Sequence, residues 1–133
     1  MRFELKKVRY IPAQLQQGIL YVSKEFSIAV HLCACGCETK IRTPLGPTEW
    51  LVKGTRKSPT LNPSVGNWQE ACRSHYWIRD GEVLWADKWT PEQITAGRHH
   101  EERRRTAYYD ARGTTRTGIV RRLWLWAKNL LSK

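Results

Sequence analysis

His31-Leu-Cys-Ala-Cys-Gly-Cys37 brings a histidine and three cysteines into seven consecutive residues. In an extended strand, side chains two residues apart share a face, so His31, Cys33 and Cys35 point the same way. The glycine that follows has no Cβ and allows a turn that returns the last cysteine to the same point. Thiolates and imidazole converging in this way are the ligands that Zn²⁺ binds tetrahedrally, so the stretch predicts a zinc-stabilised domain.

Two further candidate ligands, Cys72 and His75, follow later in the chain. The four cysteines are Cys33, Cys35, Cys37 and Cys72. If all four bind one ion, the metal is structural, because a catalytic zinc keeps one position open for water. Alternatively, His31 or His75 replaces a cysteine. The spacing differs from the paired Cys-x-x-Cys turns of a zinc ribbon, but three cysteines so close together are unusual for isolated buried thiols.

The length of 133 residues is enough for one domain and an appendage, and seven Trp and five Tyr supply large side chains for a core. No apolar run follows the first charged residues, and no stretch approaches the roughly 18 apolar residues that span a bilayer. We therefore expect a cytoplasmic protein. In a reducing compartment, the cysteines favour metal binding over two disulfides.

Positive charge is concentrated near the end of the chain. Residues 98–133 carry ten Lys and Arg against three acidic residues, a net charge of +7 out of the total of +11. Aromatic residues interleaved with basic residues along a sheet, typical of a nucleic-acid surface, are not evident. We therefore do not expect a nucleic-acid partner.

Seven short runs of alternating or apolar residues, bounded by turn-forming residues, predict β-strands. They cover residues 3–10, 18–23, 27–33, 39–43, 50–53, 76–79 and 82–86. The last two flank Asp80-Gly81, a dipeptide typical of a type I′ hairpin turn. In the third strand, alternation predicts one core face and one metal-binding face. These faces hold Ile28, Val30 and Leu32, and Ala29, His31 and Cys33, respectively.

The C-terminal part is predicted to be helical. Thr90 can cap a helix, Pro91 suits its first position and Gln93 completes a capping box. Residues 111–118 are expected to form a polar linker before a second helix over 119–131. The apolar face of that second helix holds Ile119, Val120, Leu123, Trp126, Ala127, Leu130 and Leu131.

These patterns predict an α+β protein. Residues 1–89 are expected to form a small, mainly antiparallel β domain with one zinc site, and residues 90–133 a basic helical C-terminal extension. The apolar face of the extension either packs on the domain, lies on a membrane surface or docks a partner.

Ser64 and His75 are the candidates for chemistry, because a histidine can serve as the base that activates a serine. Pro and Gly flank the serine and predict a tight loop over residues 60–68. That loop could offer backbone N–H groups to an oxyanion, with Asn67 as a further donor. The residue types alone favour a turn serine, and a histidine that is a ligand or an ordinary strand residue.

Three motifs in one order resemble a family of small bacterial proteins encoded beside ubiquitin-like conjugation genes in bacterial ubiquitination-like (Bub) operons. The motifs are His31-Leu-Cys-Ala-Cys-Gly-Cys37, Leu61-Asn-Pro-Ser-Val-Gly-Asn67 and Cys72-Arg-Ser-His-Tyr-Trp-Ile78. The resemblance spans roughly residues 1–89 and implies a deubiquitinase-like peptidase, active in antiphage defence, that processes or deconjugates a ubiquitin-like protein. It further implies that Ser64 is the nucleophile, that His75 is the base and that the cysteines hold a structural zinc.

The resemblance leaves the residue that orients the base open. The candidates are His31, Asn67, Glu70 and Asp87. We expect the substrate's C-terminal tail to bind as an added strand beside the serine. The groove that receives it is predicted to be lined by Trp50, Trp68 and Trp77. Expected partners are the ubiquitin-like protein, its conjugates and enzymes of the conjugation pathway.

Two other functions are compatible with the same residues. A zinc-dependent hydrolase would hold a catalytic zinc through His75, Cys72 and one or two further residues and keep one position open. A non-catalytic zinc-binding adaptor would bind protein or nucleic acid through residues 98–133 and cleave nothing.

Overall fold

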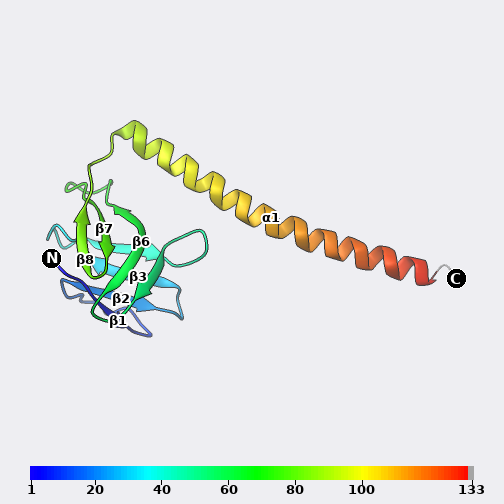
Figure 1. Ribbon diagram of the computed structural model, residues 1–133, viewed down its shortest axis with the longest axis horizontal. Coiled ribbons are helices and arrows are strands. Elements are labelled where there is room, and N and C mark those ends of the chain that lie inside the picture. The colour runs from blue at the N-terminus through cyan, green and yellow to red at the C-terminus, as the bar shows by residue number, and fades with distance from the viewer. Residues whose placement is uncertain (132–133) are drawn as a thin grey trace. The chain divides into compact units, whose positions relative to one another are not determined.

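The chain forms two units (Figure 1). The computed structural model describes residues 1–131, and the side chains of residues 114–119 and 131 are outside this description. The first unit, Met1–Thr90, contains the β-strands, and the second begins at Pro91. Among the described residues, no helix is both long and apolar enough to cross a membrane.

Two four-stranded sheets make up the first unit. One sheet, in the order β1-β2-β3-β4, contains β1 (Glu4–Lys7), β2 (Ile19–Ser23), β3 (Ile28–Leu32) and β4 (Lys40–Pro44). The other, in the order β5-β6-β7-β8, contains β5 (Leu51–Gly54), β6 (Pro59–Gly66), β7 (His75–Arg79) and β8 (Glu82–Trp85). Neighbouring strands are antiparallel except β1 and β2, which run parallel. The predicted α+β class with small, mainly antiparallel sheets is confirmed.

One core is shared by the two sheets. Its buried residues are Phe3, Leu20, Val22, Ala29, Cys33, Ala34, Leu61, Val65, Tyr76 and Ile78. Backbone hydrogen bonds also join the N-terminal strand to the second half of the unit. The N–H of Phe3 donates to the carbonyl of Gly81 over 2.7 Å, and that of Leu5 donates to Arg56 over 2.7 Å. The N-terminus therefore helps to close the core.

The predicted faces of β3 need correction. Ala29, His31 and Cys33, assigned to a metal-binding face, are each fully buried, and Ala29 and Cys33 belong to the core cluster. Val30, on the opposite face, is also buried. The reason is that the face with Ala29 and Cys33 packs against residues of the second sheet, among them Tyr76 and Ile78, and so contributes to the core. Core and metal ligands therefore share one face.

Residues 60–68 do not form the predicted loop, because β6 occupies most of this segment and pairs with β5 and β7. Its pairing with β7 shifts in register between Leu61 and Val65. Pro63 lies in this irregular stretch, after a cis peptide bond with Asn62. A residue without an N–H is tolerated there because the regular ladder is already interrupted.

The β7–β8 hairpin matches its prediction. Asp80 and Gly81 have φ angles of 50° and 81°, and a type I′ turn requires positive φ at both central residues. Arg79 and Glu82 pair directly across the turn. The turn thereby fixes the register that places His75 at the start of β7.

One helix, α1 (Pro91–Leu131), replaces the two predicted helices (Figure 1). It begins at the predicted proline, but it continues through residues 111–118, so the predicted linker is wrong. Polar residues do not end a helix by themselves, no proline follows Pro91, and an interior glycine costs a helix only about 1 kcal/mol. The predicted positions of the Ile119 and Leu131 side chains lie outside the described residues.

Candidate active site and metal centre

Ser64 on β6 and His75 on β7 face each other. The Ser64 hydroxyl donates a hydrogen bond to His75 Nε2 over 3.0 Å. Alternation along β7 directs Tyr76 and Ile78 into the core and His75 to the other face. His75 is only 5% exposed, whereas Ser64 is half-buried. The hydroxyl is therefore the more accessible member of the pair.

A backbone carbonyl orients the imidazole. His75 Nδ1 lies 2.8 Å from the carbonyl oxygen of Asp87, and the N–H of Ala86 donates to the His75 carbonyl over 2.8 Å. A carbonyl can only accept, so this network places the proton on Nδ1 and leaves the Nε2 lone pair for the hydroxyl of Ser64. The hydroxyl, the imidazole and the carbonyl are thus in line, an arrangement of groups that serine hydrolases use.

Three indole rings surround the imidazole of His75. Their centroids lie 5.0 Å (Trp68), 5.2 Å (Trp89) and 5.6 Å (Trp77) from its own. Trp68 and Trp89 also stack on each other at 5.6 Å and 17°. These rings exclude water from the imidazole and restrict its rotation, which preorganises a base.

Two further residues support the pair. Trp50 Nε1–H donates to the backbone carbonyl of Ser64 over 3.4 Å. Gly66 pairs with His75 in the strand register, and a Cβ there would come within 2.4 Å of Trp68 Nε1. Glycine is therefore needed for Trp68 to reach the imidazole. Each of the three tryptophans predicted beside Ser64 contacts one member of the pair.

The four cysteine sulfurs lie within 4.8 Å of one another. The Sγ–Sγ distances are 3.5 Å for Cys33–Cys35, 3.8 Å for Cys37–Cys72 and 4.0 Å for Cys33–Cys72. Four sulfurs placed about 2.3 Å from a tetrahedral ion are about 3.8 Å apart, so the cluster fits one metal ion. With four thiol ligands, no position remains for a reacting water.

Ser74, which precedes His75 in sequence, lowers the pKa of Cys35 and Cys72. Its side-chain hydrogen bond is the largest cause that lowers the pKa of Cys35 to about 6. Burial acts to raise the pKa of Cys72, but hydrogen bonds with Ser74 contribute to a net lowering. Burial raises the pKa of Cys33 to about 12. A metal must hold Cys33 as thiolate, so we expect its occupancy to fall as pH falls.

His31 is a core residue outside the group of clustered sulfurs. Its Nε2 lies 2.7 Å from Tyr76 Oη, which also accepts the N–H of Ala34 over 3.3 Å. His31 Nδ1 is buried without a partner. A buried lone pair is tolerated better than a buried N–H, so this network places the proton on Nε2. Burial lowers the pKa of His31 to about 4, so the ring is neutral at neutral pH.

Asn67 contacts one cysteine of the cluster and the residue that precedes His75. Its Nδ2 donates to Cys72 Sγ over 3.5 Å, and its backbone N–H donates to the carbonyl of Ser74 over 2.8 Å. To serve as an oxyanion donor, the side chain would have to give up its bond to the sulfur. Glu70 is exposed, and its N–H donates to the carbonyl of Asn67 over 3.3 Å.

Of the four candidates for orienting His75, Asp87 is the one that lies at its Nδ1. The contact is made by the backbone carbonyl, which residue type alone does not indicate. Trp89 was not considered, because it follows the last predicted strand and nothing local ties it to the histidine. Both lie in the segment between β8 and α1.

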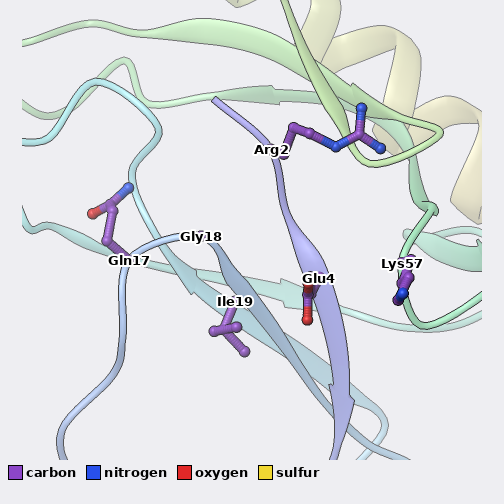
Figure 2. Close-up of a pocket in the computed structure, with 6 residues that line it drawn as sticks. All are labelled: Arg2, Glu4, Gln17, Gly18, Ile19 and Lys57. Atoms are coloured by element: carbon purple, nitrogen blue, oxygen red, sulfur yellow. The ribbon is translucent and has the colours of Figure 1, made fainter.

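A surface pocket lies elsewhere in the first unit (Figure 2). Its lining residues are Arg2, Glu4, Gln17, Gly18, Ile19 and Lys57. Figure 2 shows these residues around an open space beside β1 and the start of β2. Neither Ser64 nor His75 lines the pocket, so it is separate from the candidate active site.

Comparison with known proteins identifies the family. The model of the bacterial ubiquitination-like system serine protease (BubE) family matches residues 7–86, more than half of the chain. This chain therefore belongs to the BubE family of serine proteases of bacterial ubiquitination-like systems, which confirms the resemblance seen in the sequence. No curated protein and no solved structure matches the chain. The matched range includes Ser64, His75 and the four cysteines and ends before Asp87.

Proposed function

We propose that this chain is a serine peptidase that cuts at the C-terminus of a bacterial ubiquitin-like protein. Ser64 is the nucleophile and His75 the general base. The observation that carries the proposal is the line of hydrogen bonds from Ser64 Oγ through His75 to the carbonyl of Asp87, 3.0 Å and 2.8 Å long. The family supports the protease class and the pathway.

In the proposed reaction, His75 Nε2 takes the proton of Ser64 as Oγ attacks the scissile carbonyl. The imidazolium keeps its bond from Nδ1–H to Asp87 and then gives the proton to the leaving amine. Water, activated by the same imidazole, hydrolyses the acyl-enzyme. Backbone N–H groups of the irregular part of β6 would hold the oxyanion. A carbonyl lacks the full charge of a carboxylate, so we expect slower turnover than with a Ser-His-Asp triad.

The substrate tail would enter as an extended segment. β5 pairs with β6 only over Pro59–Asn62, so an extended tail could lie along the following residues of β6, which carry Ser64. Trp50, Trp68 and Trp77 would line its path. The tail of a ubiquitin-like protein fits this requirement if it is flexible, whether the bond cut joins it to a short extension or to a target.

We further propose that the metal is zinc and that its role is structural. The donor set is four thiols with tetrahedral spacing, which favours zinc. We expect a reducing, cytoplasmic location, because thiols that bind a metal must stay reduced. Antiphage defence stays a prediction from the resemblance.

Chelation separates a structural from a catalytic metal. Removing zinc should unfold Met1–Thr90 and abolish cleavage together, and adding zinc back should restore both. Near-ultraviolet circular dichroism and cleavage would be measured on the same samples. Activity lost from a folded domain would favour the zinc-dependent hydrolase instead.

The central experiment uses the purified full chain and the ubiquitin-like protein encoded beside it, carrying a C-terminal extension. Intact mass would follow cleavage by wild type, Ser64→Ala and His75→Ala, with zinc counted in each. We expect cleavage by wild type alone and zinc in all three. A fluorophosphonate probe, which labels activated serines without a substrate, should label wild type and not Ser64→Ala.

Two matched variants control for general effects of the substitutions. Ser58→Ala and His99→Ala change the same residue types outside the candidate site and should cleave as wild type does. Absence of both labelling and cleavage in a folded, zinc-loaded wild type would refute the proposal and favour the adaptor. An isopeptide-linked conjugate as second substrate distinguishes deconjugation from precursor processing.

A further inference from the structure

The last turns of α1 carry an apolar face that is exposed in the described structure. Val120, Leu123, Trp124, Trp126 and Leu130 are each between 59% and 66% exposed. A helix that belongs to a soluble domain normally buries such a face, and contiguous exposed apolar patches mark interaction sites.

The helical positions of these residues form one stripe. At about 100° per residue, Leu123 and Leu130 lie at its centre, while Trp124 and Trp126 lie at opposite edges, roughly 160° apart. Tryptophan favours the boundary between water and hydrocarbon, because its ring is apolar and its N–H is polar. The stripe therefore has the arrangement of a helix that lies flat in an interface.

Basic residues border the stripe on both sides. Arg121 and Lys128 follow the edge marked by Trp124, and Arg122 follows the edge marked by Trp126. Lys128 Nζ lies 4.8 Å from the centre of the Trp124 ring, so a cation and an indole share one edge. If the apolar stripe faces the acyl chains of a lipid bilayer, these basic side chains lie at the depth of the lipid headgroups.

The charge of the sequence around the stripe indicates which kind of surface the helix binds. No Asp or Glu follows Asp110, whereas six Lys and Arg do. Nucleic acid would satisfy these charges but would not bury leucines. A neutral protein groove would bury the leucines but would not use the charges. An anionic phospholipid surface satisfies both.

We propose that residues 120–130 bind the surface of an anionic phospholipid membrane as an interfacial helix, with Leu123 and Leu130 facing the acyl chains. An interfacial helix of this kind lies in the plane of the membrane. The protease unit would thereby be held at a membrane, and substrates there would be cut preferentially.

The test uses the full chain and sedimentation with vesicles of phosphatidylcholine, with or without phosphatidylglycerol. Leu123→Glu is compared with Leu125→Glu, a matched control, because Leu125 lies between Arg121 and Arg122 on the basic side of the helix. Both variants change the net charge equally. We expect binding to the anionic vesicles, weakened by salt, and reduced about 10-fold or more by Leu123→Glu but much less by Leu125→Glu.

Several results would overturn this proposal. The first is that wild type does not bind anionic vesicles. The second is that Leu123→Glu and Leu125→Glu lose vesicle binding to the same extent. The third is that wild type binds neutral vesicles as well as anionic vesicles. Tight binding to an RNA or DNA oligonucleotide that both variants retain, without vesicle binding, would assign the tail to nucleic acid. Circular dichroism would verify that both variants keep the helix. Labelling of Ser64 by the fluorophosphonate probe should be the same in both, so failure here leaves the peptidase proposal separately testable.

Discussion

Two buried histidines in the first unit each meet a hydroxyl group through Nε2, but the two pairs differ in their chemistry. His75 lies 3.0 Å from Ser64 Oγ, and His31 lies 2.7 Å from Tyr76 Oη. The difference is at Nδ1: that of His75 meets the carbonyl of Asp87, whereas that of His31 has no partner. The partner of Nδ1 therefore determines whether Nε2 accepts or donates the hydrogen bond to the hydroxyl.

Opposite tautomers follow from this difference. With its proton held on Nδ1, His75 can accept the proton of a serine. With its proton on Nε2, His31 donates and makes the tyrosine an acceptor. A histidine beside a hydroxyl is thus a base only when a fixed acceptor holds the far nitrogen, which here is a main-chain atom.

The largest difference between the two pairs should appear in turnover. His75→Ala is expected to lower kcat about 10³-fold or more, because it removes the base, while His31→Ala should leave kcat per folded molecule within about 3-fold. Near-ultraviolet circular dichroism and bound zinc would measure the folded fraction of each variant. Similar losses of kcat in the two variants would remove the distinction.

Stability should show the reverse order. His31→Ala opens a cavity in the core and removes a hydrogen bond, which should lower the free energy of unfolding by about 2–4 kcal/mol. The measurement is urea denaturation with zinc present. His75→Ala should cost less, because the hydroxyl partner of His75 is half-buried, whereas His31 and its partner Tyr76 are both fully buried. An equal or larger cost would contradict this assignment.

Removing only the hydroxyl that each histidine contacts tests the same difference between the two pairs. Tyr76→Phe deletes the acceptor of His31 and of the Ala34 N–H, so we expect a loss of about 1–2 kcal/mol in unfolding free energy and nearly normal cleavage. Ser64→Ala should abolish cleavage and change stability by less than about 1 kcal/mol, because its side chain is half-buried. Thermal unfolding and cleavage of both variants would be measured in parallel.

The smallest effect is on the pH dependence of stability. Burial lowers the pKa of His31 to about 4, from the usual value of about 6.5 in the unfolded chain. Below pH 6.5 the unfolded state binds a proton at His31, whereas the folded state does so only near pH 4. The free energy of unfolding therefore decreases as pH falls from about 6.5 toward 4. The loss should reach about 1 kcal/mol near pH 5.5.

This pH effect would be measured by urea denaturation from pH 7 to roughly pH 5.5, with bound zinc followed in every sample. His31→Gln cannot titrate and should lack this component. An identical pH dependence in the two proteins, at equal zinc content, would show that His31 does not cause it.

Local chemistry predicted much of the fold. Asp80-Gly81 defines its hairpin through two positive φ angles, and Pro91 marks the start of α1. One prediction failed because neighbouring strands overrode a local preference, and another because polar composition alone does not end a helix. Residues around Pro63 pair as a strand because β5 and β7 lie on either side, and residues 111–118 stay helical although their composition resembles a linker.

The amino-acid sequence by itself determined the reactive groups, because their identity depends on residue type. The cysteine-rich stretch beginning at His31, the serine at position 64 and the histidine at position 75 are all evident without coordinates. Only the tertiary structure decided which groups orient and surround that histidine. These groups include the main-chain carbonyl of Asp87 and the ring of Trp89, and a carbonyl occurs in every residue, so only its position in space gives it a role.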